Sequence, residues 1–436
     1  MDNNLQDRLR RLGVVKGTRS LKPAEPRPDP PIISDLSGYE QPFDPADDDI
    51  PALETLLPGG RLQQTEIGAC FVLDKVYPLT HLHGQDCLAD LLALSLETAA
   101  QFCRDDRLTS LGFHDFLFLD TETTGLMGAG TLAFMVGAAF WEGEAFVVRQ
   151  YFLRDHDDEP AMLLLLADLL AQKQGLITFN GRTFDLPLLD NRYLMNRLDG
   201  LAGDLLERPH IDLLPPARRL WRRRLGSCAL GALEKSLLGV RRTEEDVPGW
   251  LIPGLYLDYL RSGDARELLR VFYHNRLDML SMVTLAARVL RHFARPQTED
   301  PTLDLVSLAR WQQSLGSTAE AETTLRMAAA EEVSLEHYHQ VLFELGNLLK
   351  REGRRQEAVT LWQQIAVTAF DNIEAHLELA KYYEWEQRDF GEALTWTQQA
   401  LSLVRSWPAR QAELVEEELL HRQARLERKL EAGFSP

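Results

Sequence analysis

The hydrophobic pattern of this chain changes near residue 300, and that change limits the folds open to it. Between residues 65 and 300, short runs rich in aromatic and β-branched residues, such as FLFLD, EAFVVRQYFL and GLITFN, come with helix-like segments between them. After residue 300 only helical periodicity remains. Strands that come first and then alternate with helices predict an α/β domain, in which helices pack on the faces of a mixed β-sheet. An all-α domain is expected to follow it.

The helical region carries a weak internal repeat. Three Glu-Ala pairs each follow a turn and open a helical run, at intervals of 37 and 35 residues: Glu320-Ala321, Glu357-Ala358 and Glu392-Ala393. This period resembles that of tetratricopeptide helix pairs, which are about 34 residues long. We expect the repeats either to bind a protein partner or to brace the first domain, and the sequence leaves both roles open.

The first part of the chain has a different composition. Prolines recur between Pro23 and Pro51 among acidic and small residues, with an acidic run at residues 47–49. Such a segment buries too little apolar surface to offset the entropy of ordering, so we expect disorder. The sequence thus predicts three parts: a disordered Pro/Asp-rich segment at 1–62, the α/β domain at 63–297 and the helical repeat domain at 298–436.

The charge balance excludes some functions. The chain has 47 Lys and Arg against 66 Asp and Glu, a net charge of −19, which argues against a protein that coats nucleic acid or anionic membrane with its whole surface. Its 4 cysteines form no CxxC pair, so a disulfide framework and a structural zinc site are not expected. Neither an apolar signal core at the start nor an apolar run of about 18 residues occurs. We expect a soluble, cytoplasmic protein without a membrane partner.

The segment FLFLDTETTG, residues 116–125, carries the strongest chemical signal. Asp120 and Glu122 are two residues apart at the end of an apolar strand, so their side chains emerge on one face. Unpaired carboxylates are costly at a buried strand end, and a shared divalent cation removes that cost. The turn at Thr123 and Thr124 would present backbone N–H groups to a substrate oxygen. The alternative is an acidic pair that faces solvent at the edge of a loop.

Two later segments place further acids beside apolar residues. In LITFNGRTFDLPLL a strand leads into Asn180 and a glycine turn, and Asp185 then opens an apolar helical run. Asp185 also fits a structural helix N-cap. In VFYHNRLDMLSMV, His274 and Asp278 are four residues apart and therefore share one face of a helix, next to a core-like stripe. A solvent-facing pair on that helix is the alternative.

Together the three segments look like the ExoI, ExoII and ExoIII motifs of the DEDD 3′–5′ exonucleases, which have the ribonuclease H-like fold. FNGRTFD, with Asn five residues before Asp, is similar to the second motif of the proofreading exonucleases of family B DNA polymerases. The chain as a whole resembles the YprB-like group of predicted exonucleases, over about residues 65–295 and more weakly beyond. Members of that group often carry a tetratricopeptide-like tail.

The resemblance implies a two-metal phosphodiesterase that acts as a 3′–5′ exonuclease on a single-stranded 3′ end of DNA or RNA. Oxygen ligands without thiolates suit Mg²⁺ or Mn²⁺. Two ions roughly 3.5–4 Å apart would activate water and stabilise the leaving 3′-oxygen. By this resemblance, Asp120 bridges both ions, while Glu122 and Asp278 serve one of them. Asp185 acts mainly through ordered water on the other.

The sequence offers two neighbouring residues, Tyr273 and His274, for the transfer of the proton. In the histidine subclass of the family the residue with this role lies five positions before the last acid, and in the tyrosine subclass it lies four positions before. Here Tyr273 is at minus five and His274 at minus four from Asp278, so each residue type has the other's spacing. We favour His274, because it shares a helix face with Asp278 and imidazole titrates near neutral pH.

A basic strip interrupts the acidic chain at residues 208–242. It carries nine Lys and Arg against two acids, an excess of seven positive charges between the second and third acidic motifs. We predict that Arg222 and Arg223 contact nucleic-acid phosphates and that Trp221 stacks on a base. Beside the metal site we also predict nucleic-acid contacts for Thr123, Thr124 and Asn180. A solvated helix face is the alternative for the strip.

Two other functions compete with an exonuclease. A structure-specific endonuclease on the same fold would use the same carboxylates but would also cut circular single strands. A non-catalytic adaptor would act through its helical repeats and would have no use for four clustered acids.

Overall fold

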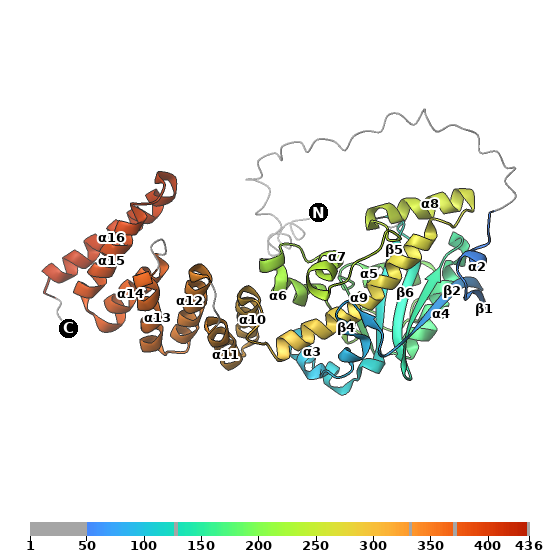
Figure 1. The fold of residues 1–436 in the computed structure, drawn as a ribbon, viewed down its shortest axis with the longest axis horizontal. Helices are drawn as coiled ribbons and strands as arrows, with labels where there is room; N and C mark the ends of the chain where they lie inside the picture. Colours follow the sequence, from blue (N-terminus) through green and yellow to red (C-terminus); the bar gives the residue numbers. More distant parts are fainter. Residues whose placement is uncertain (1–49, 126–129, 331–333, 369–372, 434–436) are drawn as a thin grey trace, which may run out of the picture. The chain divides into compact units, whose positions relative to one another are not determined.

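The computed structural model describes residues 50–125, 130–330, 334–368 and 373–433, and Figure 1 shows its ribbon. Most of the segment predicted to be disordered, residues 1–49, lies outside the described residues. Helix α2 (Leu53–Leu56) and strand β1 (Gly60–Thr65) begin before residue 63. Because Leu53 packs into the core and β1 pairs with the next strand along its length, the predicted boundary at residue 62 is too late.

A seven-stranded mixed sheet forms the centre of the α/β domain. Besides β1, its strands are β2 (Gly68–Pro78), β5 (Phe116–Thr123), β6 (Ala133–Glu142), β7 (Ala145–Phe152), β8 (Gly175–Thr178) and β9 (His210–Asp212). Their order across the sheet is β1-β2-β7-β6-β5-β8-β9. The pairs from β1 to β5 are antiparallel, whereas β8 and β9 add to β5 in parallel. A separate hairpin pairs β3 (Leu82–His83) with β4 (Asp86–Cys87). The predicted mixed sheet is confirmed.

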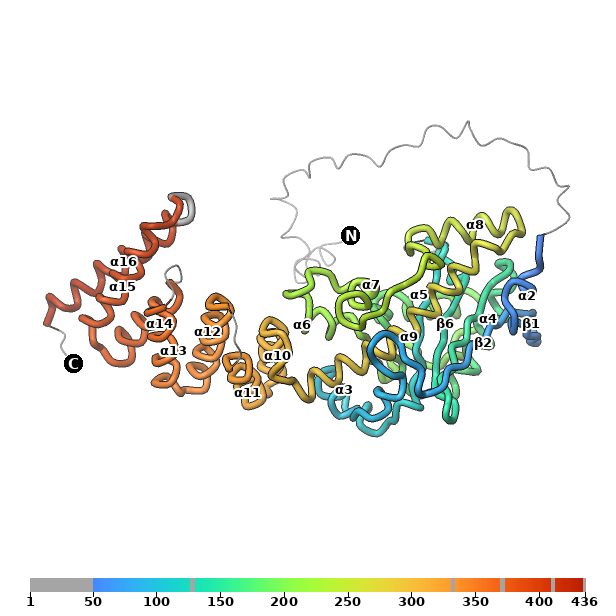
Figure 2. Tube along the Cα trace, viewed as in Figure 1, coloured from blue at the N-terminus to red at the C-terminus, as the bar shows by residue number. Residues whose placement is uncertain are grey.

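Helices cover both faces of this sheet. They are α3 (Leu96–Cys103), α4 (Glu159–Ala171), α5 (Asp185–Met195), α6 (Leu214–Leu225), α7 (Leu230–Leu233), α8 (Ile252–Ser262) and α9 (Leu268–Ala294). Strand β5 is buried on both faces: Leu117 and Leu119 pack with α4, α5 and α8, and Phe116 and Phe118 pack with α3 and α6. This double burial explains its unbroken apolar run. The long helix α9 contacts β5 and β6, and its course can be followed in Figure 2.

The C-terminal region is all-helical, as predicted. Its helices are α10 (Thr302–Leu315), α11 (Thr318–Ala329), α12 (Leu335–Arg351), α13 (Arg355–Thr368), α14 (Glu374–Tyr382), α15 (Phe390–Val404) and α16 (Ala409–Glu431). The alanines of the three Glu-Ala pairs, Ala321, Ala358 and Ala393, are fully buried near the starts of α11, α13 and α15. Small residues at these places let paired helices approach closely, while the tetratricopeptide assignment stays a prediction.

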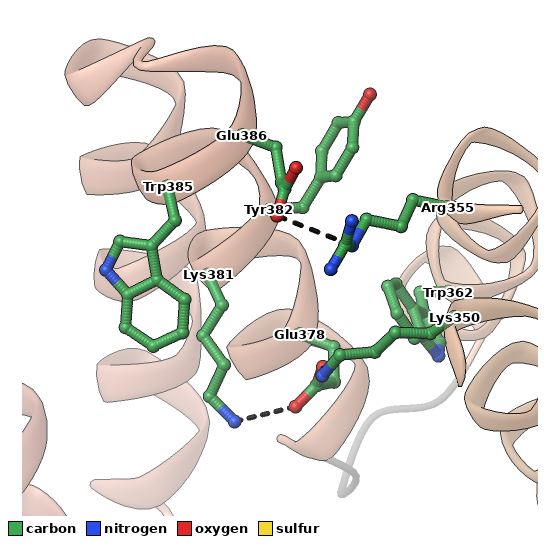
Figure 3. A pocket seen from close by; sticks show the side chains of 8 residues that line it. All are labelled: Lys350, Arg355, Trp362, Glu378, Lys381, Tyr382, Trp385 and Glu386. Carbon is green, nitrogen blue, oxygen red and sulfur yellow. Dashed lines mark hydrogen bonds and ion pairs between the residues drawn. The ribbon is translucent and has the colours of Figure 1, made fainter. Parts of the chain in front are cut away.

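A hollow of about 200 Å³ lies in this helical region (Figure 3). Its lining side chains are Lys350, Arg355, Trp362, Glu378, Lys381, Tyr382, Trp385 and Glu386. Both lysines pair with Glu378, and Arg355 pairs with Glu386. Three cations thus face two acids here, and the described residues that line the hollow include no group of unbalanced carboxylates. Among the described helices, none combines the length and the apolar character that a membrane crossing requires.

A buried histidine at the edge of the sheet affects stability. His210 begins β9, is 3% exposed, and its Nε2 lies 2.8 Å from Oγ1 of Thr178. Burial, together with the positive charge of Arg182, lowers the pKa of His210 from 6.5 to about 3. The unfolded chain therefore binds a proton below pH 6.5 that the folded protein excludes. The resulting contribution to stability is complete above that pH and is lost as the pH falls toward 3.

We expect the His210→Gln variant to show a weaker pH dependence of stability than the wild type. At pH 5, keeping this ring unprotonated costs the wild-type fold about 2 kcal/mol, because each pH unit below the ordinary pKa is worth about 1.4 kcal/mol. Chemical unfolding at pH 7 and pH 5 measures the effect. The loss of stability between the two should be about 2 kcal/mol smaller in the variant. Equal losses in both proteins would contradict a buried, neutral His210.

Candidate active site

The first two predicted carboxylates lie at the end of β5. Asp120 and Glu122 alternate with Thr121 along this strand, so both emerge from the same face of the sheet. Asp120 lies opposite Gly137 of β6. From α9, Asn275 donates through Nδ2 to Oδ2 of Asp120 at 3.0 Å. The carboxylate of Asp120 at the end of β5 is therefore hydrogen-bonded to helix α9.

Asp185 joins this strand end from α5. It is the first residue of that helix and 3% exposed, and the preceding Phe184 is the N-cap position. Its Oδ1 accepts from the backbone N–H of Thr121 at 3.1 Å and from the Thr121 hydroxyl at 2.5 Å. The carboxylate is thus fixed to β5. The alternative of a helix N-cap is wrong, because Phe184 occupies that position and Asp185 lies inside the helix.

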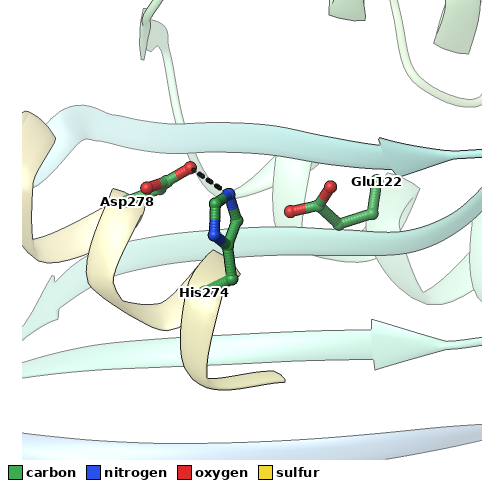
Figure 4. Close-up of side chains that lie close together, drawn as sticks. All are labelled: Glu122, His274 and Asp278. Atoms are coloured by element: carbon green, nitrogen blue, oxygen red, sulfur yellow. Dashed lines mark ion pairs between the residues drawn. The ribbon is translucent and has the colours of Figure 1, made fainter. Parts of the chain in front are cut away.

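The third segment brings its two residues to the same place. On α9, His274 and Asp278 lie one turn apart, and Nε2 of His274 is 3.5 Å from Oδ2 of Asp278. Ligand atoms of Glu122, His274 and Asp278 all lie within 4.8 Å of one another (Figure 4). The predicted sharing of a helix face is therefore confirmed, and the alternative of a solvent-facing pair is wrong.

The pKa values of the acids reflect their burial and the charges around them. Burial raises the pKa of Asp120 well above its ordinary range, and the charges of Asp185, Glu122 and Asp278 raise it further. Burial likewise raises the pKa of Glu122 to about 7, against the opposing charge of His274, and that of Asp185 to about 6. Four ionised carboxylates at this place therefore repel one another. Bound cations would relieve that repulsion, and the hard oxygen donors suit a divalent ion.

Asn275 is a member of the site to which the sequence assigned no role. Its Oδ1 accepts from Nε2 of Gln150 at 3.1 Å, and that amide also donates to the backbone oxygen of Phe272 at 2.9 Å. This fixes the amide so that its Nδ2 points at Asp120. Gly137 leaves the room for it, because a Cβ there would lie 2.3 Å from Asn275 Oδ1.

We expect Gly137→Ala to displace Asn275 and release Asp120. The added methyl has no room, so the amide must move and lose its bonds to Asp120 and Gln150. Loss of such a supporting contact costs about 10–100-fold in activity, and overpacking costs about 1–3 kcal/mol of stability. Steady-state kinetics of the phosphodiester hydrolysis that the sequence predicts measure the loss of activity, and thermal unfolding measures the loss of stability.

The matched control for that substitution is Gly254→Ala on α8. A Cβ at Gly254 meets nothing within 4 Å, so this variant should keep the wild-type rate. A Gly137→Ala protein as active as Gly254→Ala would contradict the role given to Asn275.

Tyr273 and His274 have different surroundings. The hydroxyl of Tyr273 accepts from Oγ1 of Thr243 at 3.1 Å and from its backbone N–H at 3.4 Å. The ring of His274 instead lies among the carboxylates. Burial opposes a charge on this ring, but Asp278 and Glu122 outweigh it and raise its pKa above 6.5. His274, and not Tyr273, therefore lies beside the carboxylates, and its role in proton transfer stays a prediction.

Arg242 belongs to the site rather than to an open basic strip. Its side chain is 14% exposed, and its guanidinium donates to Asp278 and Glu234. The sequence placed Arg242 in the strip from charge counting alone. No periodic spacing relates it to α9, so only the tertiary structure could reveal this contact.

The turn residues predicted to contact nucleic acid are partly engaged within the protein. Thr123 donates from Oγ1 to the backbone oxygen of Gly125 at 2.7 Å, and Oγ1 of Thr124 accepts from the N–H of Leu132 at 3.1 Å. Asn180 is exposed, and its Oδ1 accepts from Thr183 at 2.9 Å. Its positive φ of 69° matches the tight turn predicted after β8. These contacts order both turns, and nucleic-acid binding by the three residues stays a prediction.

The prediction that Trp221 stacks on a base is wrong. Its side chain is 1% exposed and packs in the core beneath α6. Arg222 and Arg223 are exposed on the same helix, whereas Arg224 pairs with the buried Asp304 of α10 at 2.7 Å. Part of the strip therefore contacts the helical region, and nucleic-acid binding by Arg222 and Arg223 stays a prediction.

Comparisons with known proteins agree with this geometry. The family model of the RNase_H superfamily matches residues 117–290, a stretch that contains all four carboxylates. The "Uncharacterized protein YprB" of Bacillus subtilis is 33% identical over 344 residues, which are 76% of this chain and 80% of the relative. A domain of this superfamily supports the interpretation that the protein is a nuclease. RNase H-like nucleases typically use divalent metals. The chain belongs to the YprB family and carries a domain of the RNase H superfamily.

Proposed function

We propose that this protein is a metal-dependent 3′–5′ exonuclease that acts on single-stranded ends of DNA or RNA. One observation carries the proposal: Asp120, Glu122, Asp185 and Asp278 come from three distant segments and lie together at one strand end of an RNase H-superfamily domain. A cluster of mutually repelling carboxylates is costly for the fold, and metal-assisted phosphodiester hydrolysis gives it a use.

The residues fit such a site. Two Mg²⁺ or Mn²⁺ ions, when bound, supply an activated water and stabilise the leaving oxygen. Asp120 and Glu122 would hold the metal from the strand, and Asp278 would hold it from α9. Asp185, fixed by Thr121, would complete the ligand set from α5.

His274 would accept the proton of the attacking water. Its Nε2 faces Asp278 and Glu122, which places it at the edge of the carboxylate cluster. Positioned proton transfer contributes about 10²–10⁴-fold to such reactions. The exposed Arg222 and Arg223 would attract the phosphate backbone, since the rest of the chain is acidic.

The 3′–5′ polarity rests on the resemblance of the three acidic segments to the DEDD exonucleases. Oligonucleotides labelled at each end in turn test it. A 3′ label should leave as a mononucleotide at once, while a 5′ label should remain on steadily shorter products. Circular single strands should survive.

Other outcomes of this assay point elsewhere. Cleavage of the circles would favour a structure-specific endonuclease. A protein that hydrolyses no DNA or RNA in Mg²⁺ or Mn²⁺ would instead be an adaptor.

Two roles for the helical region remain predictions: a brace for the α/β domain and a surface for a protein partner. A brace is supported by contacts with the α/β domain, such as Arg104 Nη2 donating to the backbone oxygen of Ser314 at 2.9 Å. A surface for a protein partner is supported by Trp385, which lines the hollow of Figure 3 and is 58% exposed.

A further inference from the structure

We propose that Arg242 and Asp246, from the segment that precedes α8, are positioning residues that hold Asp278 and His274 in their working geometry. Their catalytic consequence rests on the proposed nuclease function. Their contacts with the two α9 residues can be tested without it.

Arg242 is fixed by a buried carboxylate. Its Nε and Nη2 donate to the two oxygens of Glu234, each at 2.7 Å, and the Glu234 side chain is 2% exposed. A planar guanidinium bound through two nitrogens cannot rotate freely. Its Nη2 therefore stays directed at Oδ1 of Asp278, to which it also donates. The other oxygen of Asp278 is left on the side of His274.

Glu234 is itself held from the core. The Ser281 hydroxyl lies 2.5 Å from Glu234 Oε1 and 2.7 Å from Nε2 of His83. A carboxylate only accepts, so the Ser281 hydroxyl donates to Glu234 and accepts from the His83 N–H. Burial lowers the pKa of His83 to about 4, so that ring is neutral. A hydrogen-bonded chain thus runs from β3 to Arg242.

Asp246 fixes the ring of His274. Its Oδ1 lies 2.8 Å from Nδ1 of His274 and 3.4 Å from Nη1 of Arg242. Arg242 has no acceptor, and the carboxylate oxygen has no hydrogen to give. Nη1 of Arg242 also lies 3.0 Å from Nδ1 of His274, and a hydrogen bond between these two nitrogens would need an unprotonated Nδ1. We infer that the shorter contact of Nδ1 with the Asp246 carboxylate prevails, so that Nδ1 of His274 carries a hydrogen and Nη1 of Arg242 donates to Asp246. Nε2 is left to face Asp278 and Glu122, where a proton would be accepted.

Two substitutions separate the contributions. Asp246→Ala removes the acceptor for His274, while Arg242→Lys keeps the charge but cannot bind Glu234 and Asp278 as a fork. We expect kcat to fall about 10–100-fold in each, with the KM for an oligonucleotide within a few-fold of wild type. Metal-dependent activity should persist at this reduced level.

Two matched variants serve as controls. Glu245→Ala changes an exposed acid of the same segment, and Arg261→Ala removes an arginine whose side chain is 75% exposed on α8. Both should keep the wild-type kcat and melting temperature. An Asp246→Ala or Arg242→Lys protein that melts with the wild type and keeps its kcat would overturn the proposal.

Nitrogen-15 NMR of histidine-labelled protein gives a readout that is independent of catalysis. In alkaline buffer, where the ring is neutral, His274 of the wild type should carry its hydrogen on Nδ1, and Asp246→Ala should shift it toward Nε2. The His274→Gln variant assigns the signal. A wild-type His274 with an unprotonated Nδ1 overturns this proposal even if the protein is a nuclease. Protonated Nδ1 in a protein without nuclease activity refutes only the proposed function.

Discussion

Asp120→Asn is expected to lower phosphodiester hydrolysis by on the order of 10⁴-fold or more, the scale seen when a group essential to the chemistry is removed. Asparagine keeps the shape of the side chain and can still accept the hydrogen bond from Asn275. It cannot supply the negative charge that a shared cation needs. End-labelled oligonucleotide assays under single-turnover conditions measure the rate.

The same substitution should leave the fold intact or stabilise it. Burial and the charges of Asp185, Glu122 and Asp278 all oppose ionisation of Asp120. The neutral amide removes this repulsion, so in EDTA we expect Asp120→Asn to melt no lower than the wild type. Glu142→Gln, at the exposed far end of β6, is the matched control and should keep full activity. If Asp120→Asn hydrolysed oligonucleotides at the wild-type rate, the assignment of the site would be wrong.

Chelation is expected to abolish activity, and Mg²⁺ or Mn²⁺ should restore it. The four carboxylates are hard oxygen donors, so Zn²⁺, which prefers nitrogen and sulfur ligands, should restore activity less well. Metal binding should also be visible without catalysis. At about 100 times its dissociation constant, an ion that binds only the folded protein adds about 2.7 kcal/mol of stability.

Thermal unfolding with and without Mn²⁺ checks this second expectation. The wild type should melt at a higher temperature in Mn²⁺, because the ion relieves the repulsion among the acids. Asp120→Asn should show a much smaller shift. Activity that survives EDTA, or an equal Mn²⁺ shift in both proteins, would contradict a metal site at this strand end.

The sequence predicted the three acidic segments because their signals are local. FLFL is apolar on both faces, so it reads as a buried strand, and the acids that follow it stand out. The four-residue spacing of His274 and Asp278 likewise needs only helix geometry. Resemblance to a known family then indicated that the segments converge, and the electrostatics of Asp120 agree.

Trp221 was misplaced although the sequence held the correct signal. Leu214, Ala217, Leu220 and Trp221 recur at the spacing of one buried helix face, and all four are buried. Counting positive charges along α6 emphasised its arginines and overlooked this stripe. A hydrophobic residue at such a spacing belongs to the core more often than to a binding surface.

The supporting residues of the site could not be predicted in the same way. Asn275, Gly137 and Gln150 act through contacts between a helix and two strands, and each is unremarkable in its local sequence. Arg242 and Asp246 reach α9 from an irregular segment, for which no period applies. Tertiary packing alone brings these groups together.

Anomalous diffraction from crystals grown with Mn²⁺ tests the central claim most directly. We expect manganese peaks among the carboxylates of Asp120, Glu122, Asp185 and Asp278, with the oxygen of Asp278 that faces His274 turned toward the metal. Manganese bound only elsewhere, or Asp185 or Asp278 turned away from the end of β5, would contradict the account.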